Sequence, residues 1–285
     1  MGSDVARATM RRAAALVAVT AGAALPVRAQ SMLLEIRPRP GDTLHLQLDQ
    51  KVEITGVTRI ADRDSTMSMT MSTTILARAI VISADTLAAR VVAVTDSVAV
   101  TGGGGQSAEA QPAPGIRSMR GSRVEMRVFR DGSSEIVSDP AALTSELRSL
   151  VAQMPATLPR TPIPVGYSWT RVVTVPVETK DGLVASASLS TTFRFDSLSK
   201  DKEIAFLSMR GELTPSRADS ASGTAGVEMS GTLRGGMSVD RHRGWMVDSR
   251  AVITLRTFLP ATGSRVRPVR LNWTITQRMR ALDKR

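Results

Sequence analysis

The feature that most constrains this chain is the alternation of apolar and polar residues at every second position. Leu44, Leu46, Leu48, Val52 and Ile54 are each followed by a polar or charged residue. The same pattern recurs within residues 227–239 and 269–279. Successive side chains of a strand point to opposite faces of its sheet, so each stretch has one apolar and one polar face. Such one-sided strands are typical of antiparallel sheets.

The alternation predicts a mainly β protein. About eleven strands are expected, over residues 42–55, 66–82, 87–100, 122–130, 134–138, 167–178, 184–197, 203–214, 225–239, 245–258 and 265–282. Asp131-Gly132 predicts a tight turn, and residues 240–244 a looser one. The glycine run 102–105 and the residues up to Pro114 have the composition of a flexible linker.

One helix is expected, over residues 140–154. Asp139 can cap it, Pro140 suits the first helical position, and leucines recur at helical spacing. Pro155 ends this pattern, and four prolines between residues 155 and 164 are too dense for regular structure. Residues 155–165 are therefore expected to connect two halves, with the helix covering the sheet.

The two halves, residues 30–154 and 166–285, are similar in sequence. Three matches carry the similarity. Gly41-Asp-Thr-Leu and Val52-Glu53 match Gly166-Tyr-Ser-Trp and Val177-Glu178, and the matching residues are 125 positions apart. Thr73-Thr74-Ile75 matches Thr191-Thr192-Phe193 at an offset of 118, and Met126-Arg-Val128 matches Met237-Ser-Val239 at an offset of 111. Offsets that fall steadily are expected of a duplication with loops of unequal length. The sequence predicts one compact duplicated domain and leaves open whether it contains one sheet or two.

Residues 1–29 have the organisation of a secretory signal peptide. Arginines precede a short uncharged run, and Val27-Arg28-Ala29 offers small residues for cleavage after Ala29. The run is shorter than the roughly 20 apolar residues that span a bilayer, and no later run is longer. We therefore expect a periplasmic or secreted protein without a transmembrane segment.

Composition restricts the chemistry. The chain has no cysteine and only two histidines, His45 and His242, and neither has a carboxylate suitably placed in sequence for acid–base catalysis. We expect no enzyme activity, no cofactor and no metal site built from cysteine or histidine. Removing the signal peptide removes four Arg and one Asp, which lowers the net charge from +11 to +8. Aromatic residues make up 3%, too few for nucleic-acid stacking, so an anionic envelope component is the expected charged partner.

Methionine and tryptophan supply the remaining candidates. Met67, Met69 and Met71 share one face of an expected strand, where thioethers can bind Cu(I) or fill an irregular apolar core. Trp169 follows the proline-rich connector, and Trp273 lies on the apolar face of its strand. Both tryptophans suit core packing or the lining of a ligand cavity.

Four features together resemble a known kind of protein: the signal peptide, the Gly-Asp-Thr-Leu opening, the segment ending in Pro164-Val-Gly-Tyr-Ser-Trp169, and the hairpin Asp240-Arg-His-Arg-Gly-Trp245. They are similar to a family of uncharacterised exported bacterial β proteins, whose sheets resemble the half-barrels of lipoprotein carriers of the LolA kind. The resemblance implies a large curved antiparallel sheet, covered by one helix, with a concave apolar face able to take a lipid-like group.

These observations favour a non-enzymatic binding protein for an apolar or amphipathic ligand. Its expected ligand residues are Leu147, Val151, Trp169 and Trp273. The alternatives are a structural or interaction module of the cell envelope whose sheet is filled by its own side chains, a hydrolase, and a Cu(I) binder that uses Met67, Met69 and Met71.

Overall fold

The computed structural model describes residues 31–60, 63–104, 108–109, 120–137, 157–178, 184–215, 228–259 and 268–282. They form a single twelve-stranded antiparallel sheet. The strands are β1 (Thr43–Ile60), β2 (Arg63–Ala84), β3 (Ala88–Gly104), β4 (Ala108–Glu109), β5 (Arg123–Phe129), β6 (Ser134–Ile136), β7 (Ser168–Glu178), β8 (Val184–Leu198), β9 (Ile204–Pro215), β10 (Glu228–Asp240), β11 (Trp245–Leu259) and β12 (Val269–Ala281).

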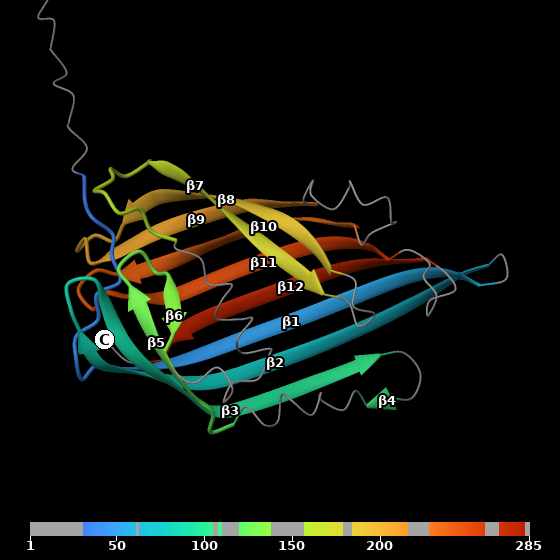
Figure 1. The fold of residues 1–285 in the computed structure, drawn as a ribbon, viewed down its shortest axis with the longest axis horizontal. Coiled ribbons are helices and arrows are strands. Elements are labelled where there is room, and N and C mark those ends of the chain that lie inside the picture. Colours follow the sequence, from blue (N-terminus) through green and yellow to red (C-terminus); the bar gives the residue numbers. More distant parts are fainter. Residues whose placement is uncertain are drawn as a thin grey trace, which may run out of the picture.

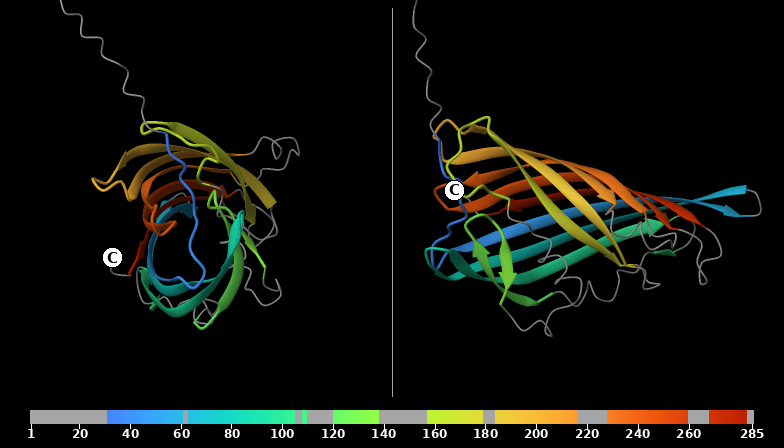
Figure 2. Two further views of the ribbon diagram at one scale, coloured as in Figure 1. Left: turned by 90° about the vertical axis from the view of Figure 1, so that its left-hand side faces the viewer. Right: turned by 45° about the horizontal axis from the view of Figure 1, so that its top comes forward.

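The sheet is curved and does not close. Its strand order is β6-β5-β3-β2-β1-β12-β11-β10-β9-β8-β7, with β4 beside β3. Strands β6 and β7 are therefore the two edges, and the sheet curls between them into a trough (Figures 1 and 2). The expected mainly β half-barrel is confirmed, and both halves of the chain belong to one sheet.

The eleven expected strands are all present, with two differences at their ends. The hairpin of β1 and β2 is longer than expected, because these strands extend to Ile60 and begin at Arg63. The linker expected at residues 102–105 is wrong for its first part, since Gly102 and Gly104 lie in β3 opposite Met71 and Met69. Glycine lowers strand propensity, but its backbone groups pair with β2 as those of any residue do.

Two expected segments lie outside the described residues. These are the covering helix at 140–154 and the signal peptide at 1–29. Within the described part of the chain there is no helix.

The order of strand pairing repeats between the two halves. Strands β1, β2, β3 and β5 pair in the same order as β7, β8, β9 and β10. One row of directly opposite residues in the first half is Leu44, Ala79, Ala93 and Val124, and the corresponding row in the second half is Trp169, Phe193, Met209 and Gly235. The offsets from the first row to the second are 125, 114, 116 and 111.

Backbone hydrogen bonds repeat in the same way. The N–H of Gly41 donates to Val81 O, and the N–H of Gly166 donates to Phe195 O. Each partner is followed by a shift of register, between Val81 and Ser83 in one half and between Phe195 and Ser197 in the other. Two of the offsets between sequence matches, 125 and 111, recur between these rows. The offset of 118 between Thr73 and Thr191 does not recur, since the corresponding residues of β2 and β8 are 114 positions apart. The duplication itself stays a prediction.

A segment of the chain crosses one end of the trough. This N-terminal strap, residues 31–42, is drawn in blue across the opening in the left view of Figure 2. Its backbone hydrogen bonds reach both halves: Met32 pairs with Ile163, and the N–H groups of Ile36, Arg37 and Gly41 donate to the carbonyls of Arg130, Gly244 and Val81. We call this the proximal end and the opposite one the distal end.

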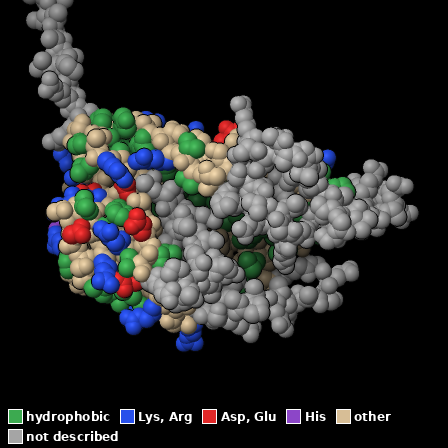
Figure 3. Space-filling model, viewed as in Figure 1, with side chains coloured by type: hydrophobic (Ala, Val, Ile, Leu, Met, Phe, Trp, Pro, Cys, Tyr) green, Lys and Arg blue, Asp and Glu red, His purple; other side chains and the backbone are tan. Residues whose placement is uncertain are grey.

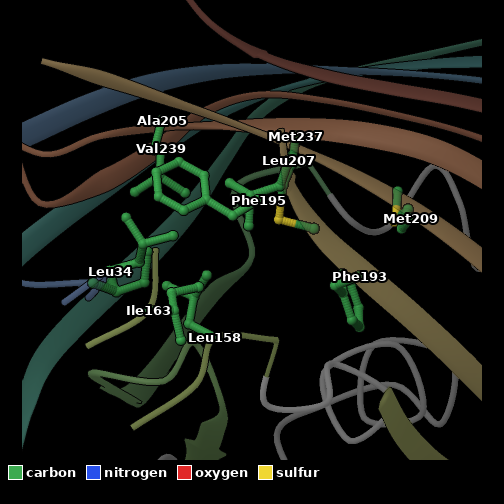
Figure 4. Close-up of a cluster of buried hydrophobic side chains, with 11 residues drawn as sticks. Leu34, Leu158, Ile163, Phe193, Phe195, Ala205, Leu207, Met209, Met237 and Val239 are labelled. Atoms are coloured by element: carbon green, nitrogen blue, oxygen red, sulfur yellow. The ribbon is translucent and has the colours of Figure 1, made fainter. Parts of the chain in front are cut away.

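The main core lies under the strap at the proximal end. Leu34 of the strap, together with Leu158 and Ile163 of the segment before β7, packs against Phe195 and other buried side chains of β8, β9 and β10 (Figure 4). Leu34, Leu158 and Ile163 are each at most 2% exposed. The proline-rich residues 157–164 are thus part of the core as well as a connector. A smaller cluster around Leu44, Val81 and Val91 continues the core across β1, β2 and β3.

Candidate functional site

The apolar face of the sheet continues beyond the core to the distal end. On each strand, the side chains that alternate in phase with the core residues form the concave face, and the others form the convex face. The distal concave face comprises Ile54, Met67, Met69, Leu213, Leu255, Leu271 and Trp273. Met67 is 53% exposed and Met69 37% exposed. Hydrophobic side chains are visible in the hollow of the sheet (Figure 3).

Glycines shape this face. A Cβ on Gly56 would lie 2.7 Å from Met67 Cγ and 3.0 Å from Leu271 Cδ2. A Cβ on Gly231 would lie 2.3 Å from Thr254 O and 2.7 Å from Leu255 Cδ2. Large side chains of neighbouring strands thus cover these glycines, which have no side chain of their own. This arrangement allows a strongly curved sheet to keep its strands close together.

Trp273 of β12 lies in the floor of the distal concave face. In register it stands between Ile54 of β1 and Leu255 of β11, and Met69 of β2 follows beyond Ile54. The indole Nε1 is buried and has no hydrogen-bond partner among the residues that the structure describes. A buried N–H without an acceptor costs about 1–3 kcal/mol. The tryptophan therefore offers an unused donor in an otherwise apolar surface.

A pocket of about 350 Å³ opens at the distal rim. Its lining combines apolar residues, among them Met229, Phe258 and Leu271, with Arg256 and Arg270. The register assigns Met229 and Leu271 to the concave face, and Phe258 and both arginines to the convex face. The pocket therefore lies where the apolar floor meets cationic side chains.

The expected ligand residues do not all meet. Trp169 packs on the proximal core, where its ring stacks on Phe193 with centroids 5.7 Å apart and its Nε1 donates to Thr157 O at 2.7 Å. Trp169 shares the concave face with Trp273, but β7 and β12 are separated by four strands. Leu147 and Val151 lie outside the described residues. Arginines around the rim are expected from the sequence, but Arg256 and Arg270 could not be singled out, because no local pattern links β11 and β12 to a rim.

The three methionines share one face, as the alternation predicts. Met67, Met69 and Met71 stand opposite Gly56, Ile54 and Val52 on the concave side. The Met67 side chain covers Gly56 and contacts the position that its Cβ would occupy. This contact is ordinary packing, and Cu(I) binding by the three residues stays a prediction.

The described residues contain no recognisable catalytic or metal arrangement. No group of three or more His, Asp or Glu side chains among them is placed to hold a metal ion. His45 and His242 are both exposed. The pKa of Asp49 is lowered, chiefly by the hydrogen bond from Gln47, and that of Asp85 by the backbone N–H groups of Ala88 and Leu87. Both carboxylates lie away from the distal concave face.

No protein-family model matches the chain, and no curated protein is significantly similar to it. Several solved structures are similar to it, of which two are described here. One is a DUF1329 family protein from Desulfovibrio piger, with 10% identity over 79% of this chain and 83% of that chain and a TM-score of 0.14. The other is a putative outer membrane lipoprotein-sorting protein domain from Vibrio parahaemolyticus, with 7% identity over 82% and 83% and a TM-score of 0.15.

The identity between this chain and either structure is 10% or less. The half-barrel itself is established by the strand order and registers of this chain. Among the described residues, no helix has the length and hydropathy to span a membrane.

Proposed function

We propose that this protein is an exported, non-enzymatic carrier that binds the apolar part of an amphiphile against the distal concave face. The observation that carries the proposal is the buried, unpaired indole N–H of Trp273 in a partly exposed apolar surface. Ligand sites are typically apolar concavities with a few polar groups that orient the ligand. In this arrangement, the Trp273 N–H donates to a carbonyl or ester oxygen of the ligand.

The class of ligand follows from the rim. Arg256 and Arg270 are exposed and have no ion-pair partner among the described residues. They adjoin the apolar lining of the rim pocket. An acyl chain in the trough with a phosphate or carboxylate head at the rim satisfies both surfaces, because guanidinium groups bind such anions well.

Two further parts of the proposal concern residues that this geometry does not test. We place Leu147 and Val151 of the expected helix 140–154 over the apolar face, and Trp169 at its proximal boundary. Export follows from the expected signal peptide ending at Ala29. The periplasm or the cell exterior is then the compartment in which the amphiphile is bound.

Binding of monomeric lysophosphatidylglycerol, followed by intrinsic tryptophan fluorescence, tests the proposal. Met67→Asp introduces a charge into the trough and should weaken binding at least tenfold. Its matched control is Val172→Asp, since Val172 is 65% exposed and on the convex face, and should leave binding unchanged.

The head group and the indole are tested separately. Lysophosphatidylcholine should bind more weakly than lysophosphatidylglycerol, and Arg256→Gln should reduce that difference. Trp273→Phe keeps the apolar ring but removes the donor, so it should weaken binding of either lipid. Absence of any binding by the wild-type chain would contradict the proposal and favour a sheet filled by its own side chains.

A further inference from the structure

A line of arginines crosses the convex face of strands β9 to β12. Arg210 of β9 lies directly opposite Arg234 of β10, and Arg250 of β11 lies directly opposite Arg278 of β12. Arg234 itself stands opposite Val252, two residues from Arg250, so the two pairs are diagonal neighbours. We call these four residues the arginine line.

Three of the four residues of the arginine line have no ion-pair partner among the described residues. Like charges directly opposite each other on neighbouring strands are destabilising. Of the four, only Arg278 has a described ion-pair partner, Asp248 at 3.2 Å. Arg210, Arg234 and Arg250 are exposed, so their charge is available to an external anion.

The other half of the convex face differs. There Arg78 pairs with Asp96 at 3.0 Å, and Arg90 pairs with Glu125. Arg90 also stands opposite Arg127, and Arg123 is exposed without an ion-pair partner among the described residues, so some positive charge is unpaired in both halves. What distinguishes β9–β12 is that Arg210, Arg234 and Arg250 are neighbours in the register. A positive electrostatic potential that is concentrated on one face orients the protein as it approaches an anionic surface.

Exposed apolar side chains lie among these charges. Val252, opposite Arg234, is 44% exposed, and Phe206 of β9 is 41% exposed on the same face. Apolar side chains beside cationic ones are typical of proteins that lie on an anionic membrane, where the former enter the interface and the latter contact head groups. Nucleic acid is a poorer fit, because the described convex face of β9–β12 has few aromatic side chains, Phe206 and Phe258 among them, and stacking needs several.

We propose that the convex face of β9–β12 docks on an anionic lipid surface. This goes beyond the binding of a single amphiphile in the trough, since it assigns a different face and a different partner. Arg256 lies on the same convex face of β11 as Arg250. A docked molecule therefore has its distal rim close to the lipid from which an amphiphile would come.

Sedimentation with vesicles of mixed phosphatidylglycerol and phosphatidylcholine tests the docking surface. The wild-type chain should bind these vesicles, bind pure phosphatidylcholine weakly, and dissociate as salt screens the charges. Each cationic side chain near an anionic surface contributes about fivefold to binding. The triple variant Arg210→Gln, Arg234→Gln, Arg250→Gln should therefore bind about 100-fold more weakly.

The matched control removes the same charge from the other half of the convex face. Arg78→Gln, Arg90→Gln, Arg123→Gln should reduce vesicle binding by less than about fivefold, as expected of a distant, screened change. Equal losses in the two triple variants would overturn the proposal, because net charge alone would then explain binding. If the first triple variant does not fold, Arg234→Gln alone should lower binding about fivefold.

Two further measurements separate the possible partners. Phe206→Ser with Val252→Ser should weaken vesicle binding, whereas full binding by this variant together with efficient competition by dextran sulfate would overturn a lipid surface in favour of a soluble polyanion. Monomeric lysophosphatidylglycerol should bind to the Arg210, Arg234, Arg250 variant as to the wild type. A failure of vesicle docking is thus distinguishable from a failure of amphiphile binding in the trough.

Discussion

Replacing Asp131 with Asn tests how the proximal end of the half-barrel is held together. The Asp131 side chain is 4% exposed. Its Oδ1 accepts hydrogen bonds from Ser133 N at 3.0 Å and Ser133 Oγ at 2.6 Å, and its Oδ2 accepts from Arg160 Nε and Nη2 at 3.0 and 2.9 Å. The carboxylate thus joins the β5–β6 turn to the segment that leads into β7.

The expected loss is about 2–3 kcal/mol of unfolding free energy. Asn still accepts from Ser133, but its amide NH₂ faces the N–H groups of Arg160. Hydrogen bonds to a charged group contribute about 1.5–3 kcal/mol each when buried. The Arg160 side chain is 82% exposed, so its pairing with Asp131 contributes about 1 kcal/mol at most, and the rest comes from the weakened bonds of Ser133.

The loss should depend on pH. Burial acts to raise the pKa of Asp131, but the hydrogen bonds from Ser133 and the guanidinium of Arg160 outweigh it, and the pKa is lowered. A carboxyl whose pKa is lower in the folded state stabilises the protein above its unfolded pKa of about 3.9. That stabilisation disappears as the pH falls through the folded pKa.

Urea unfolding of the two proteins at a series of pH values measures this difference. The gap between wild type and Asp131→Asn should be constant from neutral pH to about pH 5 and then shrink below about pH 4. Asp196→Asn, which affects an ion pair 3.8 Å long with an exposed Arg194, should change stability by less than about 0.5 kcal/mol. A gap for Asp131 that stays unchanged down to the acid transition would refute the reasoning.

Three other predictions follow from the packing. Leu34→Ala, at a side chain 1% exposed, should cost about 2–5 kcal/mol in urea unfolding, whereas Leu33→Ala, 39% exposed, should cost under about 0.5 kcal/mol. Gly244→Ala places a Cβ 2.3 Å from Arg37 O and should release the strap to limited proteolysis. Gly41→Ala strains the backbone through its φ of +88° but creates no clash within 4 Å, and should release the strap less. Replacing the three methionines of β2 by Leu should change stability by less than about 1.5 kcal/mol; loss of measurable Cu(I) binding in that variant would instead establish a copper site.

Much of the fold follows from local pattern. Alternation between residues 44 and 54 predicts both the strand and the face that it buries, and the same holds for Trp273 in β12. The turn at Asp131-Gly132 is also local, since Gly132 has a φ of +84°.

The sequence misled where local chemistry has two structural outcomes. Glycines 102–104 have linker composition, yet their backbone pairs with β2. Prolines between 157 and 164 exclude a helix or a strand, but they do not prevent Leu158 and Ile163 from being buried.

What the sequence by itself determined is which residues extend into strands and which side of each strand is apolar, because both depend on neighbours one or two positions away. Only the tertiary structure decided that β12 pairs with β1, that the strap crosses the proximal end, and that Arg210 faces Arg234. These are pairings of residues far apart in the chain. Their energies depend on the register of the whole sheet, and no local pattern encodes it.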